Sequence, residues 1–107
     1  MRVVVVEDNP DVAELARRQL DLAGHAVVVL PGGTAALAYD AWHRADVAVI
    51  DLRMPTIDGS HVLAYLAVHE PHVRCVVLSA DVIAAHDLHV RCVAKPWTVE
   101  ELLEAIE

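Results

Sequence analysis

Five short, almost continuously apolar runs alternate along this chain with longer segments that have a helical period. The runs are Val3–Val6, Ala26–Leu30, Val47–Ile50, Cys75–Leu78 and Val90–Ala94. Strands that are buried on both faces of a parallel sheet have this unbroken apolar character, whereas half-exposed strands alternate. The alternation therefore predicts an α/β domain with a five-stranded, mostly parallel sheet and helices on both faces.

Most of the helical segments carry recognisable end signals. Asn9 is a suitable N-cap for the first helix, and Gly24 suits its C-terminal end. The third helix begins near Asp58 and stops before a proline. Thr98 and Glu101 have the spacing of a capping box, so the last helix begins there.

Apolar residues at intervals of three and four predict the buried side of each helix. In the first helix these are Val12, Leu15, Ala16 and Leu20. In the second helix, which follows Gly32–Gly33, they are Leu37, Ala38, Ala41, Trp42 and Ala45. In the third helix they are Val62, Leu63 and Leu66, and in the last helix they are Leu102, Leu103 and Ile106.

One connection is shorter than the others. Only about ten residues separate the fourth strand from the fifth, at the lower limit for a crossover between parallel strands. The fourth helix is therefore predicted to be short or distorted.

Length and charge exclude several classes of protein. A chain of 107 residues has room for one core, because domains commonly span about 100–150 residues. The formal net charge of −8 has the wrong sign for direct binding to a nucleic acid. Glu7 and Asp8 interrupt the first apolar run before a signal peptide or membrane span could form. We expect a single domain over residues 1–107 that is cytoplasmic and has no membrane or direct nucleic-acid partner.

The cysteines and histidines form no recognisable metal or redox motif. Cys75 and Cys92 match neither a zinc spacing nor Cys-x-x-Cys, so we expect reduced, buried thiols. The histidine clusters at 69–72 and 86–89 lack a known ligand pattern. We interpret these histidines as solvated surface residues.

Polar side chains follow four of the predicted strands at the point where each strand ends. Glu7 and Asp8 follow the first strand, Asp51 the third, Ser79 the fourth and Lys95 the fifth. The carboxyl ends of parallel strands lie on one edge of the sheet, where ligands of open α/β sheets bind. We therefore expect these residues to form one site.

The composition of this site indicates its chemistry. Three neighbouring carboxylates repel one another unless a divalent cation neutralises them, and their oxygen atoms suit Mg²⁺. Lys95, the only lysine in the chain, could hold a phosphoryl oxygen, and the Ser79 hydroxyl could bind another. These are the parts required to accept a phosphoryl group on Asp51, because such transfer depends on positioning and charge neutralisation.

Five motifs occur in order along the whole chain and make a family resemblance specific. They are Val6–Asn9, Ile50–Pro55, Asp58–Gly59, Leu78–Ala80 and Lys95–Pro96. The set resembles the signature of the response-regulator receiver domain of two-component signalling, a flavodoxin-like phosphoacceptor domain. The resemblance implies a doubly wound sheet with the strand order 2-1-3-4-5.

The resemblance also implies an acceptor and a set of metal ligands. Asp51 would take a phosphoryl group from a phosphohistidine of a sensor histidine kinase or a histidine phosphotransfer protein. Asp8 would bind Mg²⁺ directly and Glu7 through water, together with Asp51 and the backbone carbonyl of Arg53. The domain would then switch a downstream interaction and catalyse only its own phosphorylation and dephosphorylation.

Four further residues have roles that the resemblance implies. Ser79 and Lys95 would contact the phosphoryl oxygens, and a cis peptide before the next proline would place the lysine. Arg53 and Asp81 occupy positions that border the site and modulate hydrolysis in the family. Our hypothesis is that these two side chains pair across the mouth of the site and restrict water.

The last strand departs from the family pattern. Cys92 stands where the family usually carries an aromatic switch residue, and Trp97 takes the packing place of the usual phenylalanine after Lys-Pro. The interval from Ser79 to Lys95 is also shorter than usual. We therefore expect that the surface formed by the fourth helix, fifth strand and last helix transmits the phosphorylation state in a different way from that of the family. Any homodimer would form through this surface and would be weak.

Two other functions compete with this interpretation. A Mg²⁺-dependent phosphohydrolase could use the same aspartate, but such enzymes normally have a second acidic residue two positions later, where this chain has Arg53. The other alternative is a receiver-like interaction module that works without phosphorylation. The short fourth helix and the missing aromatic residue would favour this second alternative.

Overall fold

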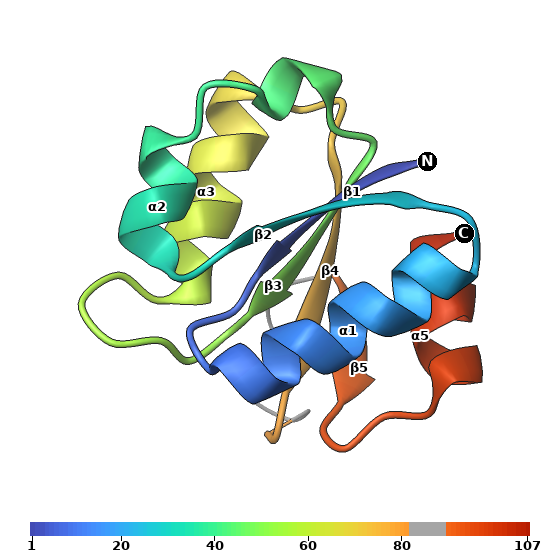
Figure 1. The fold of residues 1–107 in the computed structure, drawn as a ribbon. Helices are drawn as coiled ribbons and strands as arrows, with labels where there is room; N and C mark the ends of the chain where they lie inside the picture. The colour runs from blue at the N-terminus through green and yellow to red at the C-terminus, as the bar shows by residue number, and fades with distance from the viewer. Residues whose placement is uncertain (82–89) are drawn as a thin grey trace.

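The computed structural model describes residues 1–81 and 90–107 of the chain. Its centre is a parallel sheet with the order β2-β1-β3-β4-β5 (Figure 1). The strands are β1 (Arg2–Val6), β2 (Ala26–Leu30), β3 (Val47–Asp51), β4 (Arg74–Ser79) and β5 (Arg91–Ala94). The predicted doubly wound, five-stranded sheet is therefore confirmed. The predicted fourth helix lies outside the described residues.

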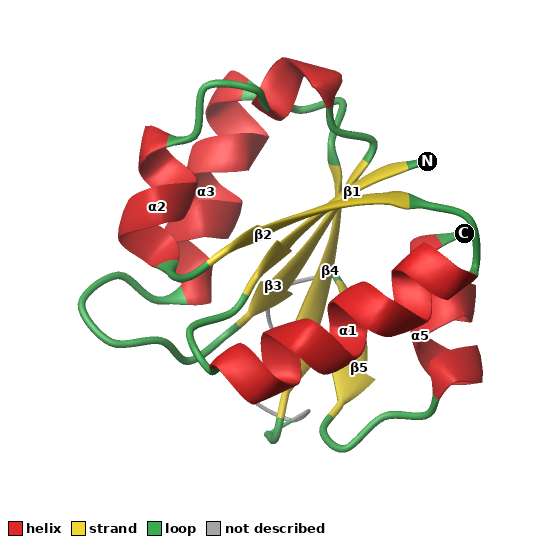
Figure 2. Cartoon of the chain, viewed as in Figure 1, coloured by secondary structure: helices red, strands yellow, loops and turns green. Residues whose placement is uncertain are grey.

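Helices cover both faces of the sheet (Figures 1 and 2). The helices α1 (Pro10–Leu22) and α5 (Val99–Ile106) lie on one face. The helices α2 (Gly33–Ala38) and α3 (Gly59–His69) lie on the other, together with a short 3₁₀ helix, η1 (Trp42–Arg44). Each of the four α-helices in the described residues follows a strand, as in a doubly wound domain.

Alternate residues of the central strands supply the two cores. Val3 and Val5 pack with the core under α1 and α5, whereas Val4 and Val6 pack with the core under α2 and α3. Both sets are almost completely buried, as is Ile50 in β3. Burying one such side chain contributes about 1.5–3 kcal/mol, so the apolar runs hold the strands between the two helical layers.

The edge strand β2 is only half buried, although its sequence is as apolar as that of β1. Val28 exposes 40% of its surface, and Ala26 is exposed as well. The prediction of burial on both faces is therefore correct for β1, β3 and most of β4, and wrong for β2 and for β5, in which only Val93 is buried. An edge strand keeps one side open to solvent, and the short α2 leaves much of the adjacent face uncovered.

The predicted helix starts are confirmed. The Asn9 side chain accepts hydrogen bonds from the backbone N–H groups of Asp11 and Val12. Asp58 caps α3 in the same way. Thr98 and Glu101 form both halves of the capping box at the start of α5. These side chains satisfy N–H groups that have no partner within the helix.

The second helix ends earlier than its sequence predicts. The apolar pattern predicts a helix through Ala45, but α2 stops at Ala38 and Tyr39 adopts an extended conformation. The indole N–H of Trp42 donates a 2.8 Å hydrogen bond to the carbonyl of Ala36, which also accepts a 3.3 Å bond from the backbone N–H of Tyr39. The chain then turns through η1, and Trp42 is buried at 2% exposure.

Two burial predictions also need correction. Leu15 is 49% exposed, and Ala13 takes its predicted place in the buried face of α1 with Ala16 and Leu20. Ala13, Ala16 and Leu20, and not Leu15, therefore define the side of α1 that faces the sheet. Cys75 and Cys92 are free thiols, as expected, but both are half-buried instead of buried.

Within residues 1–81 and 90–107, no helix is long and apolar enough to cross a membrane.

Candidate functional site

The predicted site residues gather at the carboxyl end of the sheet. Glu7 and Asp8 directly follow β1, while Asp51 and Ser79 are the last residues of β3 and β4. Lys95 follows β5, and the peptide bond between Lys95 and Pro96 is cis. Glu7, Asp51 and Ser79 are buried at 2%, 5% and 3% exposure, whereas Asp8 is exposed.

Lys95 bridges two of the three carboxylates. Its Nζ lies 3.1 Å from Oδ1 of Asp51 and 3.2 Å from Oε2 of Glu7. Burial by itself lowers the pKa of Lys95, but the hydrogen bond to Asp51 and the charges of Asp51 and Glu7 outweigh it and raise that pKa. The ammonium group is therefore held in its charged form between the two acids.

Glu7 is a buried acid beside another acid. Burial raises its pKa above the ordinary value, and the negative charge of Asp51 raises it further. The backbone N–H of Asn9 donates a 3.2 Å hydrogen bond to Oε1 of Glu7, and this bond and Lys95 act in the opposite direction. The neighbourhood thus carries more negative charge than one ammonium group neutralises.

The three carboxylates can meet around one cation. Glu7, Asp8 and Asp51 each have a carboxylate oxygen within 4.8 Å of the others, and they are the only such group of three among the described residues. Hard oxygen donors with an uncompensated negative charge suit Mg²⁺. The backbone carbonyl of Arg53 accepts no hydrogen bond from the described part of the chain and remains available as an oxygen donor. The donor set therefore fits the predicted metal.

The Ser79 hydroxyl is turned toward the chain that follows β4. It donates a 2.9 Å hydrogen bond to the backbone carbonyl of Asp81 and accepts a 3.0 Å bond from the backbone N–H of Asp81. The structure therefore places Ser79 at the predicted edge of the sheet, with its hydroxyl held by Asp81. Contact with a phosphoryl oxygen would require this hydroxyl to leave the Asp81 carbonyl.

Arg53 and Asp81 face each other at the surface of the site. The guanidinium of Arg53 lies 3.9 Å from the Asp81 carboxylate, and the two side chains are 78% and 49% exposed. This long, exposed contact contributes little stability. It nevertheless connects the loop after β3 to the chain after β4, on either side of the strand ends that carry Asp51 and Ser79.

Gly59 supports the acceptor strand, a role that its motif alone did not reveal. A Cβ atom at this position would lie 2.4 Å from the backbone oxygen of Asp51 and 2.8 Å from Cα of Leu52. The N–H of Gly59 donates a 2.8 Å hydrogen bond to the carbonyl of Leu52. Only glycine permits this close approach, so the start of α3 fixes the backbone of the acceptor residue.

The two departures in the last strand are visible in the structure. Cys92 occupies β5 with its Sγ 3.3 Å from the carbonyl oxygen of Val90, and burial raises the pKa of its thiol. Trp97 packs against the core under α1 and α5, and its indole N–H donates a 2.7 Å hydrogen bond to Oε1 of Gln19. Trp97 thereby connects the end of β5 to α1.

The comparisons with known proteins agree with this fold. Residues 3–107 match the response regulator receiver domain family, and the chain therefore belongs to that family. Receiver domains are signalling domains, and those of response regulators take phosphate from sensor histidine kinases. Membership therefore places the chain in this class and not among the phosphohydrolases.

Relatives in mycobacteria share part of their length with this chain. It is 34% identical over 109 residues to the response regulator MprA of Mycobacterium avium, covering 96% of this chain and 48% of the relative. It is 40% identical over 82 residues to the probable transcriptional regulatory protein NarL of Mycobacterium tuberculosis, covering 75% of this chain and 38% of the relative. The chain thus spans half or less of the length of these relatives.

Solved receiver domains have the same fold. A receiver domain protein from Clostridium thermocellum superimposes with a TM-score of 0.88 at 22% identity, covering 98% of this chain and 90% of that one. The response regulator TrrA of Thermotoga maritima, solved in complex with Mg²⁺ and BeF, gives a TM-score of 0.85 at 26% identity. That match covers 96% of this chain and 93% of TrrA.

Proposed function

We propose that residues 1–107 form one receiver domain that accepts a phosphoryl group on Asp51 from a phosphohistidine of a sensor histidine kinase or histidine phosphotransfer protein. The observation that supports this most is the set of contacts around Lys95. One ammonium group bridges Asp51 and Glu7 at 3.1 and 3.2 Å, beside a third carboxylate within reach of the same cation. The proposed location is the cytoplasm, where such kinases present their phosphohistidines.

The metal part of the proposal assigns four oxygen donors. Asp8 and Asp51 would bind Mg²⁺ directly, the backbone carbonyl of Arg53 would complete the protein ligands, and Glu7 would act through water. When bound, Mg²⁺ supplies positive charge against the carboxylates and the incoming phosphoryl oxygens. Asp8 is exposed to solvent, whereas Asp51 and Glu7 are buried.

The bonds that form and break in the transfer step belong to Asp51 and the phosphohistidine alone. A carboxylate oxygen of Asp51 attacks phosphorus in line with the P–N bond of the phosphohistidine. A new O–P bond forms, the P–N bond breaks, and its electron pair stays on the imidazole nitrogen. A proton on the other ring nitrogen leaves the departing imidazole neutral. The product is an aspartyl phosphate.

Lys95 and Ser79 would hold the transferred group. Lys95 releases the Asp51 oxygen that it now contacts and pairs with a phosphoryl oxygen, which offers a stronger charge. The Ser79 hydroxyl leaves the Asp81 carbonyl and donates to a second phosphoryl oxygen. Both movements would change the chain that follows β4 and β5, through which we propose that a downstream partner reads the state.

The test is Mg²⁺-dependent labelling by a small phosphodonor. Purified protein is incubated with acetyl phosphate, with Mg²⁺ or with EDTA, and its intact mass is measured by mass spectrometry. We expect one added phosphoryl group in the wild type with Mg²⁺ and none with EDTA. Asp51→Asn should remain unlabelled because its amide cannot attack phosphorus.

Asp58→Asn is the matched control, because asparagine also caps helices and Asp58 lies outside the proposed site. This variant should be labelled like the wild type. Label retained in Asp51→Asn would contradict the assignment of the acceptor. A folded wild-type protein that stays unlabelled would favour the alternative, a receiver-like interaction module that works without phosphorylation.

A further inference from the structure

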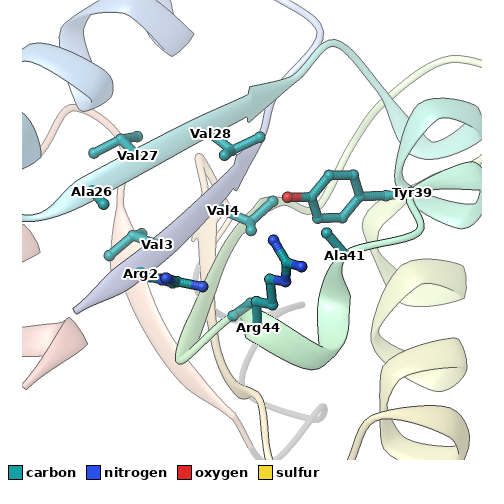
Figure 3. Close-up of a pocket in the computed structure, with 10 residues that line it drawn as sticks. Arg2, Val3, Val4, Ala26, Val27, Val28, Tyr39, Ala41 and Arg44 are labelled. Atoms are coloured by element: carbon teal, nitrogen blue, oxygen red, sulfur yellow. The ribbon is translucent and has the colours of Figure 1, made fainter.

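A pocket of about 280 Å³ lies at the opposite end of the sheet from the carboxylate site (Figure 3). Its floor is formed by Val4 and Val28, which are paired neighbours in β1 and β2. Its wall is the segment that follows α2, including Tyr39 and Arg44. Arg2, the first residue of β1, completes the rim.

The early end of α2 creates this pocket. A helix that continued through Ala45 would carry its side chains across the outer half of β1 and β2. Instead the chain leaves the helix at Tyr39, whose ring meets Trp42 edge to face at a centroid distance of 5.4 Å. Trp42 is in turn anchored to the carbonyl of Ala36. The wall of the pocket is therefore held by packed aromatic rings.

The polar groups around the pocket have no partners within the described part of the chain. Neither the Arg2 nor the Arg44 guanidinium forms an ion pair or hydrogen bond there, and the Tyr39 hydroxyl forms no hydrogen bond. Asp46 lies nearby, but its carboxylate accepts a 2.7 Å hydrogen bond from the backbone N–H of Arg2. Most other cations of this acidic chain are engaged, such as Arg17 with Glu14.

The directions of these groups converge. Figure 3 shows the Tyr39 hydroxyl and the Arg44 guanidinium pointing toward Val4, with the Arg2 guanidinium directed to the same side. Two guanidinium groups on one rim repel each other unless an anion lies between them. Guanidinium forks fit the oxygen atoms of carboxylates and phosphates.

We propose that this pocket binds a small organic oxyanion. A carboxylate or phosphate group would lie between Arg2 and Arg44 and accept a hydrogen bond from Tyr39. A flat apolar body of about one ring would cover Val4 and Val28, since the volume is slightly below the roughly 300 Å³ of the smaller ligand pockets. Because the pocket shares no residue with the phosphorylation site, this inference is independent of the proposed function.

The experiment titrates isotopically labelled protein with four probes and follows the backbone amides by NMR in EDTA. Benzoate carries a ring and a carboxylate, and phenyl phosphate carries a ring and a phosphate. Benzyl alcohol lacks the charge, and inorganic phosphate lacks the ring. We expect saturable shifts at Val28, Ala41 and Arg44 with benzoate, phenyl phosphate or both. The two incomplete probes should bind about tenfold more weakly.

Variants then assign the binding to the two arginines. Arg44→Gln and Arg2→Gln should each weaken binding of the ring-bearing anions about tenfold, since each removes a charge-assisted contact. Arg18→Gln is the matched control, because Arg18 is an exposed arginine on α1 without an ion pair in the described structure. It should bind as the wild type does. Both pocket residues are exposed, so their variants should fold.

Three results would overturn the proposal. The first is the absence of a saturable shift at the pocket amides with either ring-bearing anion. The second is equal binding of benzyl alcohol, which would show an apolar pocket without anion recognition. The third is wild-type affinity in both Arg44→Gln and Arg2→Gln. Benzoate bound in preference to phenyl phosphate would identify a carboxylate ligand, and the reverse order a phosphate ligand.

Discussion

Lys95 determines the charge balance of the site at the scale of single residues. It contacts two buried carboxylates, and the third, Asp8, lies in the same cluster without a contact to it. One positive charge against three negative charges leaves a site that favours a further cation. Its place among strand-end residues was predictable, because parallel strands bring their carboxyl ends to one edge.

Gly59→Ala should destabilise the protein, because the new Cβ would overlap the backbone of Asp51 and Leu52. We expect a loss of about 1–3 kcal/mol in the free energy of unfolding, measured with urea. Gly32→Ala is the control, since a Cβ there meets nothing within 4 Å. Equal stabilities of the two variants would contradict the proposed role of Gly59.

Arg53→Ala should shorten the lifetime of the aspartyl phosphate. The Arg53–Asp81 contact spans the surface of the site at 3.9 Å, and its loss should admit water more readily. An exposed pair of this kind contributes little, so we expect hydrolysis to accelerate only about two- to fivefold. The decay of the phosphorylated mass after removal of donor measures this rate. Arg18→Ala is the control and should hydrolyse its phosphate at the wild-type rate. The same wild-type rate in Arg53→Ala would contradict the hypothesis.

At the scale of elements, features that depend on neighbouring residues were predictable from the sequence, whereas features that depend on tertiary contacts were not. The apolar runs predicted all five strands, and Asn9 and Thr98 predicted helix starts, because these signals act within a few residues. The end of α2 depends on the indole of Trp42 reaching Ala36. Periodicity cannot reveal such a contact, so the pocket beside Tyr39 was not predictable either. The exposure of Leu15 likewise depends on which side of α1 packs against the sheet.

The cap of α3 should make stability depend on acid. The hydrogen bond from the Ser60 hydroxyl, assisted by His61, lowers the pKa of Asp58 below its ordinary value of 3.8. The ionised carboxylate therefore stabilises the fold above pH 3.8, and this contribution is lost as the pH falls through the lowered pKa. Asp58→Asn keeps a capping oxygen but cannot titrate.

Urea unfolding of both proteins over an acidic pH series checks this prediction. The wild type should exceed Asp58→Asn in stability by less than about 1 kcal/mol at neutral pH, because the Asp58 side chain is 45% exposed, and the advantage should vanish in acid. A stability difference that does not change with pH would show that ionisation of Asp58 has no part in the cap.

At the scale of the whole molecule, the two ends of the sheet differ in charge. Carboxylates gather where the strands end, and Arg2 and Arg44, which have no ion partner within residues 1–81 and 90–107, lie near the beginning of β1 and β2. The formal charge of −8 is therefore unevenly distributed over the molecule, in agreement with the proposed cation site at one end and the proposed anion pocket at the other. The helices α1 and α5 cover one face of the sheet, and α2 and α3 cover the other (Figure 2).

Mg²⁺ should raise the thermal stability of the molecule, because a cation that binds only the folded site stabilises it. At a hundred times the dissociation constant the gain is about 2.7 kcal/mol. Asp8→Asn should lose most of this gain, whereas Asp11→Asn, in the first turn of α1, should keep it. NaCl of equal ionic strength controls for screening. An equal response of both variants to Mg²⁺ would indicate that the cluster is not the binding site.

The most direct test of the central claim is to locate the phosphoryl group chemically. Protein labelled by acetyl phosphate in Mg²⁺ is treated with borohydride, which reduces an aspartyl phosphate to homoserine, and its peptides are sequenced by mass spectrometry. Phosphorylation of the site predicts homoserine at position 51 and at no other aspartate. Homoserine at another position, or labelled protein in which Asp51 remains intact, would contradict the account.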